Sequence, residues 1–528
     1  MNIPVENVGS VGIIKDVPAD KLPLQAWTDG RNVRFRDGKV VKFSGHSEVY
    51  ATPNVAPYFV MPVANATTYF WIYAGLAAIG ATDGASHADV SRTVGGAYNA
   101  TADLGWTGTV IEGVAVLNNP GDVPQMWTPA LVNDFAALTG WDATWRARAM
   151  RSLKRYLVAL DVTKGGTRFA NMIKWSHSAP DGGVPTSWDA ADNTLDAAEW
   201  VLASEGGVLL DGISLRDDLV LYKESQTWLM QYVGGIDIFR FTKKFDSFGM
   251  LTRKCAVEFF SGKHVVFTGE DLILHDGQQA QSLLSARLRT TLQNAVDSTA
   301  YARSFVVANY AEKEVWACYP EVGQTLPSKA LVWNWETNLI GLRDLPSAAH
   351  IAAGVVNPID ATETWAGAVG TWDTDPAAWG DRSFDPSKRK LLMAVPGVTK
   401  LFLPDSTQQF NAVNMASYIE RVGLGFPLKK DAPPDYSTVK LVRGLWPRIS
   451  GTVGGIVNVY IGTQDKVDGP VTYANPQSFT IGSSDMIDCL GELDASRLHA
   501  LKFESTDDIQ WALHGYEVDV VPAGMYVG

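Results

Sequence analysis

Short extended segments rich in aromatic and β-branched residues recur along this chain, and most end at Gly, Asp or Asn. Such segments predict β-strands joined by tight turns. Neighbouring segments are spaced as hairpins in several places: 219–222 with 228–233, 264–268 with 272–275, and 314–319 with 330–335. The generous content of 48 Gly and 18 Trp suits the same architecture. The sequence therefore predicts an all-β fold.

The predicted hairpins also recur at a fairly regular interval along the sequence. Between residues 150 and 345 they return at intervals of roughly 40 to 50 residues, which is the length of a four-stranded propeller blade. Trp-Asp pairs at 141–142, 188–189 and 372–373 hint at a recurring strand end, although their spacing is irregular. We therefore expect a β-propeller-like core, and an array of β-sandwiches is the alternative.

One segment departs from the strand pattern. In 281–296, Leu284, Leu288, Leu292 and Val296 follow one another at four-residue steps, which predicts an amphipathic helix. A proline-rich stretch at 427–436 (PLKKDAPPDY) then interrupts the strands. Alternating residues resume after it, so we expect a C-terminal antiparallel β-sandwich. The predicted domains are an N-terminal arm and hairpin (1–45), the propeller-like domain (46–426) and the sandwich (427–528).

The net charge is −13 and the pI is about 5.1. An acidic surface disfavours gripping DNA, although a phosphate-repelling lumen would let DNA slide. The strongest local exception is a basic cluster, interpreted as a solvated face or a ring contact: Arg146, Arg148, Arg151, Lys154 and Arg155.

The three cysteines, Cys255, Cys318 and Cys489, are isolated, so we expect reduced thiols and no zinc site. The first residues lack the features of a secretory signal, which predicts synthesis in a cytoplasm. The uncharged stretch 49–82 is broken by prolines, and we expect two buried strands there and no membrane span.

No motif for catalysis is evident. The Gly-Lys pairs at 38–39 and 262–263 lack the Ser or Thr of a phosphate loop. His264 and His275, near Asp271 and Asp276, come closest to a catalytic or metal constellation, but ordinary turn chemistry is the favoured interpretation. Asp373 and Asp375 lack the remainder of a calcium loop. We expect that the chain is not an enzyme and that it binds no cofactor.

The most distinctive segment is 26–46, AWTDGRNVRFRDGKVVKFSGH. Val33 and Phe35 alternate with Arg34 and Arg36, and Asp37-Gly38 is a typical hairpin turn. The residues alone predict a hairpin with basic side chains on one side.

This segment resembles the opening of the tail-hub, tail-nozzle and packaged-DNA stabilisation proteins of short-tailed phages, through Asn32, Arg34, Phe35, Arg36, Asp37, Gly38 and Gly45. Later segments resemble the blade motifs of the same proteins in the same order, at 174–182, 218–228, 247–249 and 271–277. The part from Tyr418 onward is similar to the terminal sandwich of some phage tail proteins.

The resemblance implies a structural virion protein, assembled in the host cytoplasm into a ring that is six-fold in the relatives. It implies contacts with its own copies, with head–tail adaptor and portal-proximal proteins, with tail fibres or spikes, and transiently with double-stranded DNA. The ring would extend the DNA channel, retain packaged DNA and conduct it on ejection. A receptor-binding spike or fibre and a polysaccharide-degrading tail protein remain as alternatives.

Overall fold

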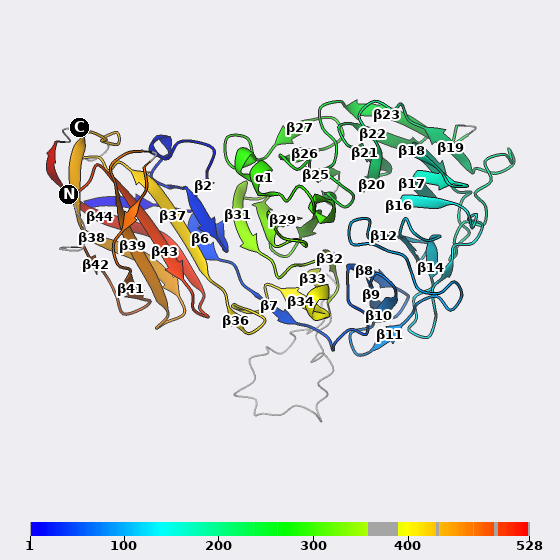
Figure 1. Ribbon diagram of the computed structural model, residues 1–528, viewed down its shortest axis with the longest axis horizontal. Coiled ribbons are helices and arrows are strands. Elements are labelled where there is room, and N and C mark those ends of the chain that lie inside the picture. Colours follow the sequence, from blue (N-terminus) through cyan, green and yellow to red (C-terminus); the bar gives the residue numbers. More distant parts are fainter. Residues whose placement is uncertain are drawn as a thin grey trace, which may run out of the picture.

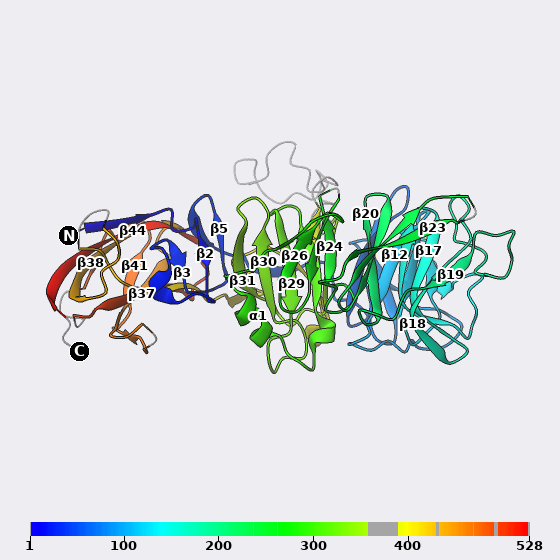
Figure 2. The same ribbon diagram turned by 90° about the horizontal axis from the view of Figure 1, so that it is seen from above.

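The computed structural model describes residues 2–235, 237–260, 262–356, 389–428, 432–467, 469–489 and 495–525. These residues form two bodies that lie side by side, a propeller and a β-sandwich (Figure 1). Seen from above, the strands of the propeller run along its axis and the sandwich flanks it at one side (Figure 2). Asp373 and Asp375, and the Trp-Asp pair at 372–373, lie outside the described residues.

The propeller has seven four-stranded antiparallel blades. The first blade contains β8 (Phe59–Ala64), β9 (Tyr69–Ala74), β10 (Ile79–Thr82) and β11 (His87–Asp89), the second contains β12 (Thr107–Ile111), β13 (Val114–Asn118), β14 (Gln125–Trp127) and β15 (Ala136–Ala137), and the third contains β16 (Arg146–Leu153), β17 (Tyr156–Lys164), β18 (Thr167–Trp175) and β19 (Ala198–Val201). The fourth blade contains β20 (Leu209–Leu215), β21 (Asp218–Lys223), β22 (Thr227–Tyr232) and β23 (Phe239–Phe245), and the fifth contains β24 (Ala256–Phe259), β25 (Lys263–Phe267), β26 (Leu272–His275) and β27 (Ala280–Ser282). The sixth blade contains β28 (Phe305–Asn309), β29 (Glu314–Tyr319), β30 (Lys329–Asn334) and β31 (Leu339–Asp344), and the seventh contains β32 (His350–Gly354), β33 (Lys390–Val395), β34 (Lys400–Pro404) and β7 (His46–Glu48).

The blades stack face to face, which explains their residue choice. Every residue of β29 is buried, as are the first seven residues of β17. A strand that is covered on both faces reads as a nearly continuous apolar run. The predicted hairpins at 219–233, 264–275 and 314–335 are present as β21–β22, β25–β26 and β29–β30. The all-β, propeller-like prediction is therefore confirmed.

The first strands of the blades surround the propeller axis. Each contacts the first strand of the next blade from β12 to β32, Met61 of β8 lies against Gly108 of β12, and β32 contacts β8. The ring is thus closed. The last blade borrows its outer strand, β7, from the N-terminal region, where Phe402 pairs with Glu48. This pairing ties the first and last parts of the propeller together.

The sandwich combines residues from both ends of the sequence. One layer contains β1 (Asn2–Glu6), β44 (Trp511–Met525), β38 (Thr438–Gly451) and β42 (Ile487–Asp488). The other contains β4 (Asp29–Arg31), β37 (Ser417–Leu424), β43 (Leu498–Ser505), β39 (Ile456–Gln464), β40 (Thr472–Tyr473) and β41 (Gln477–Thr480). The N-terminal strands β1 and β4 are therefore part of the sandwich rather than of a separate arm. The C-terminal part of the sandwich begins with β37 at Ser417, ten residues before the expected boundary at 427.

A short hairpin joins the two bodies. β5 (Val33–Arg36) pairs with β31 of the sixth blade, and β6 (Lys39–Lys42) pairs with β44 of the sandwich. One hydrophobic cluster also extends through both bodies, from Val459 and Phe503 in the sandwich to Leu331 and Val265 in the blades. The junction is therefore a continuous sheet over a shared core.

The helix prediction for 281–296 is wrong over its first half. Only α1 (Arg289–Ala295) is helical, and the residues before it belong to β27 or to an irregular turn. Ala286 has a left-handed backbone with φ of 56°, which interrupts a right-handed helix. Asp16 accepts hydrogen bonds from the amides of Thr290 and Thr291, so the helix begins where that carboxylate satisfies its first N–H groups.

Candidate functional site: the junction of propeller and sandwich

The junction is built on the hairpin that the sequence singled out. Phe35 pairs with Val40 and Arg36 with Lys39, which leaves Asp37 and Gly38 as a two-residue loop. Their φ angles are 48° and 72°, and two positive φ values define the turn that matches the twist of paired strands. Phe35 is 2% exposed and lies in the shared core.

Asn32 holds three parts of the chain together. Its φ of 56° is one that Asn tolerates better than most residues. The side-chain amide donates to Asp344 Oδ2 at 3.0 Å and to the carbonyl of Ala416 at 2.8 Å, and its oxygen accepts the amide of Asp344 at 2.8 Å. Burial alone would raise the pKa of Asp344, but Lys329 and Arg31 hold it below its usual range. Asn32 thus fixes the sixth blade against the strand that enters the sandwich.

Arg34 and Arg36 point from β5 toward two carboxylates at the β28–β29 hairpin. Arg34 Nη1 lies 2.9 Å from Glu312 and 3.3 Å from Glu314, and Arg36 bonds the same pair. Burial raises the pKa of Glu314, while Arg34 and Arg36 act in the opposite direction. The basic side of the predicted hairpin is therefore an ion-pair network inside the protein.

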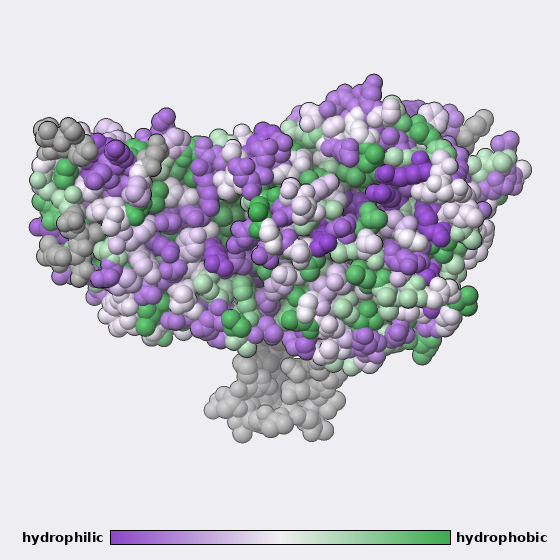
Figure 3. Space-filling model, viewed as in Figure 1, coloured by the Kyte–Doolittle hydropathy of each residue, from purple (hydrophilic) through white to green (hydrophobic). Residues whose placement is uncertain are grey.

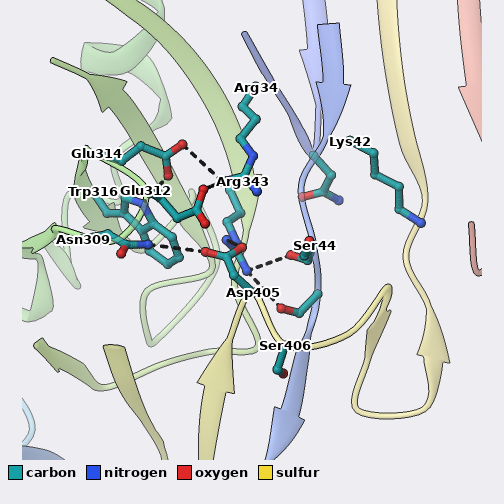
Figure 4. A network of polar contacts seen from close by, with 12 residues as sticks. Arg34, Lys42, Ser44, Asn309, Glu312, Glu314, Trp316, Arg343, Asp405 and Ser406 are labelled. Atoms are coloured by element: carbon teal, nitrogen blue, oxygen red, sulfur yellow. Dashed lines mark hydrogen bonds and ion pairs between the residues drawn. The ribbon is translucent and has the colours of Figure 1, made fainter. Parts of the chain in front are cut away.

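Arg343 lies at the centre of the network (Figure 4). It is 2% exposed, donates to Asp405 at 2.7 Å and to the carbonyl of Ser44 at 2.9 Å, and stacks 4.4 Å from the ring centre of Trp316. Beside it, Gly45 has no room for a side chain, because a Cβ there would lie 1.9 Å from the carbonyl oxygen of Gln409. The glycine is required by close packing.

Lys42 is directed to the other side of the hairpin, toward the sandwich. Its amine donates to the carbonyls of Asp507 at 3.0 Å and Ile509 at 2.9 Å, and burial lowers its pKa to about 8. The polar side chains described above therefore hold the blade, the hairpin and the sandwich together: Asn32, Arg34, Arg36 and Lys42. This arrangement offers structural rigidity rather than an open site for chemistry.

The predicted basic cluster lies elsewhere, on β16 and the turn after it. Its charges are paired with carboxylates: Arg151 with Asp211 at 2.7 Å, Arg148 with Asp161 at 3.6 Å, Lys154 with Asp217 at 3.9 Å, and Arg155 with Asp181 at 2.7 Å. Arg146 donates to the backbone carbonyls of Ala143 and Trp145. Burial would raise the pKa of Asp211, but Arg151 lowers it. The cluster and the junction are thus separate networks, and four of the five basic side chains of the cluster pair with carboxylates of the same chain.

His264 and His275 do come together, but around Tyr222. The tyrosine hydroxyl lies 2.7 Å from a ring nitrogen of each, and all three residues are buried. Burial lowers the pKa of His264 to about 4 and that of His275 to about 3. Asp271 and Asp276 instead bond Ser282 and the amides of Gln278 and Gln279. The triad is a neutral contact between two blades.

The partners of the hairpin were missed by sequence reasoning: Glu312, Glu314, Asp344, Arg343 and Asp405. A signal exists for two of them, because Glu312 and Glu314 share one side of a hairpin as Arg34 and Arg36 do. Within the described ranges, no group of His, Cys, Asp and Glu is arranged to hold a metal, and no helix there is long and apolar enough to cross a membrane.

No protein-family model and no curated protein matches the chain. Among solved structures, the chain is similar to the crystal structure of the WD40 beta propeller domain of Doa1, with 8% sequence identity and a TM-score of 0.38. That match covers 69% of this chain and 97% of the other.

Proposed function

We propose that the chain is a structural subunit of a short phage tail, a ring-forming nozzle or hub that extends the DNA channel. In this role it retains packaged DNA and conducts it on ejection, in contact with adaptor proteins above and fibres or spikes beside it. The observation that carries the proposal is the 26–46 segment, which resembles the opening of such proteins and forms the buried link between propeller and sandwich.

Rigidity of the subunit supports this role. A ring keeps its shape only if the parts of each subunit hold a fixed relation, and a large apolar interface suppresses the relative motion that is the default between domains. Here the link consists of a continuous sheet, a shared core and the buried pairs of Arg34 and Arg343. A subunit built in this way can transmit load between its two bodies.

The distribution of charge supports passage of DNA rather than capture. The chain carries a net charge of −13, and four of the five residues of its strongest basic cluster pair with its own carboxylates. On the face seen in Figure 3, apolar residues are scattered among polar ones. An acidic subunit repels phosphate, so DNA beside it can move without being held.

Electron microscopy of purified protein and of virions tests the proposal. We expect closed rings, and we expect antibody against the chain to label the tail axis. Arg343→Ala is the informative variant, because it loosens the junction: rings should become irregular or fail to close. Arg240→Ala, which removes an exposed arginine far from the junction, is the matched control and should leave rings unchanged.

Two results would contradict the proposal. One is labelling confined to peripheral fibres. The other is a protein that stays monomeric at the concentrations of assembly, both alone and with the adaptor ring.

A further inference from the structure

The outer strands of the third and fourth blades lie at the end of the propeller far from the sandwich (Figure 1). Side chains of these strands border a groove. Strands β19 and β23 form its sides, and its volume is about 1040 Å³. Trp200 of β19 is 55% exposed, although tryptophan side chains in folded proteins are mostly buried. Neither the junction nor the ring-forming role accounts for this groove.

The groove presents an aromatic surface that includes the stacked rings of Trp200 and Phe241. The Trp200 ring lies nearly parallel to that of Phe241, with 10° between the planes and 6.1 Å between the ring centres. Beneath them, Phe239 is 6% exposed and meets Trp175 edge to face at 5.4 Å. The indole N–H of Trp175 is fixed by the carbonyl of Asp196 at 2.8 Å. The aromatic surface is therefore held in place before any ligand arrives.

Polar side chains lie around this surface, and some have no partner. Asn193, Asp237 and Arg240 line the groove, and their side chains make no hydrogen bond or ion pair within the part of the chain that the structure describes. In contrast, Glu199 is occupied by Lys164 and Lys174. The groove thus combines an exposed aromatic plane with uncommitted donors and acceptors.

We propose that this groove binds a neutral oligosaccharide. A pyranose ring has a C–H face that packs on an aromatic plane and hydroxyl groups that bond amides, carboxylates and guanidinium groups around it. Trp200 and Phe241 would carry the sugar face, while Asn193, Asp237 and Arg240 would bond hydroxyls. The inference stands independently of the tail assignment, because it rests only on the groove.

The lining disfavours other ligands. Asp192, Asp196 and Asp237 outnumber Arg240, so a phosphate-rich or acidic polymer would be repelled. The core of a protein–protein interface is depleted of charged residues, whereas charged and aromatic side chains are mixed here. A neutral ligand with many hydroxyl groups fits this mixture best.

A printed glycan array tests the proposal with the full chain. It should carry neutral hexose and N-acetylhexosamine oligosaccharides beside sialylated and uronic-acid ones. We expect binding to a subset of the neutral group, followed by titration of the best oligosaccharide by calorimetry. Trp200→Ala should weaken that affinity by about tenfold or more, while Trp200→Phe, which keeps an aromatic plane, should stay within about threefold. Asp237→Asn should weaken it less than Trp200→Ala does.

Tyr301→Ala is the control, because Tyr301 is 42% exposed and lies outside the groove; its affinity should match the parent chain. Unchanged circular dichroism and thermal midpoints establish that each variant folds. Three results would overturn the proposal: no binding to the neutral oligosaccharides, preferential binding to the acidic ones, or an unchanged affinity of the Trp200→Ala variant. Loss of self-association by Trp200→Ala in sedimentation, without any glycan effect, would instead assign the groove to a second copy of the chain. Ring formation in micrographs is a separate readout, so the two proposals can fail independently.

Discussion

At the junction, Arg343 is 2% exposed, paired with Asp405 and stacked on Trp316. In the outer groove, Arg240 is exposed and makes no ion pair among the described residues, and Trp200 is more than half exposed. Both regions combine aromatic rings with charged side chains. At the junction the charged side chains pair with other groups of the protein. In the groove, the side chains of Asp237 and Arg240 have no such partner among the described residues. The first arrangement stabilises a fold, and the second can receive a ligand.

The largest expected effect comes from breaking the junction. Arg343→Leu leaves the largely covered carboxylate of Asp405, 12% exposed, without its cation, and loss of one partner of a buried pair costs about 3–5 kcal/mol. Urea denaturation followed by tryptophan fluorescence measures the change in unfolding free energy. Arg240→Leu should change it by less than about 0.5 kcal/mol. Equal effects of the two substitutions would contradict the distinction between the regions.

Packing at Gly45 gives the next largest effect. Gly45→Ala places a methyl group against the backbone of Gln409, and overpacking of this kind costs about 1–3 kcal/mol or more. Gly397→Ala is the control, because nothing lies within 4 Å of a Cβ at that position. Thermal midpoints of both variants check the prediction, and a Gly45→Ala variant as stable as the parent would show that the junction can relax.

Acid should weaken the junction before the groove. His46 is 2% exposed between Phe402 and Phe410, and burial, reinforced by Arg343, lowers its pKa to about 4. Because the folded pKa lies below that of the unfolded chain, this contribution is complete above about pH 6.5 and is lost as pH falls toward 4. At pH 4.5 the loss is about 2.5 kcal/mol. Unfolding free energies measured from pH 7 to 4.5 should fall less steeply in His46→Phe; an identical slope would exclude His46 as a cause.

The smallest effect is expected in the groove itself. Trp200→Ala removes an exposed ring from an edge strand, so the unfolding free energy should change by less than about 1 kcal/mol. Differential scanning calorimetry measures this difference. A loss comparable to that of Arg343→Leu would mean that Trp200 belongs to the core.

Local patterns predicted local structure well. The segments at 219–233, 264–275 and 314–335 are hairpins because residues adjacent in sequence pair, and their strands are buried on both faces. The turn at Asp37-Gly38 was predictable for the same reason. The helix over 281–296 failed because apolar spacing does not reveal the left-handed Ala286 or the capping carboxylate of Asp16.

Long-range pairing was out of reach. Arg34 lies 278 residues from Glu312, and only the folded chain shows that Arg34 is buried and that both arginines of the hairpin are paired. The closing strand β7 is likewise distant from its partner β34, so sequence spacing could not give the number of blades. Trp200 had no distinguishing sequence signal among 18 tryptophans, because its exposure depends on the outer position of β19.

Strands from the two ends of the sequence pair in one sheet, with Asn2 opposite Asp519, and the seventh blade needs β7 from the N-terminal region. During synthesis, the earliest residues must therefore wait for some of the last before either body is complete. Contacts of such large sequence separation form slowly. A chain released before Lys400 would lack β34 and leave β7 unpaired, and one released before Trp511 would lack β44 of the sandwich. The topology thus makes completion of the sandwich depend on synthesis of residues 511–525, which pair with strands from both ends of the chain.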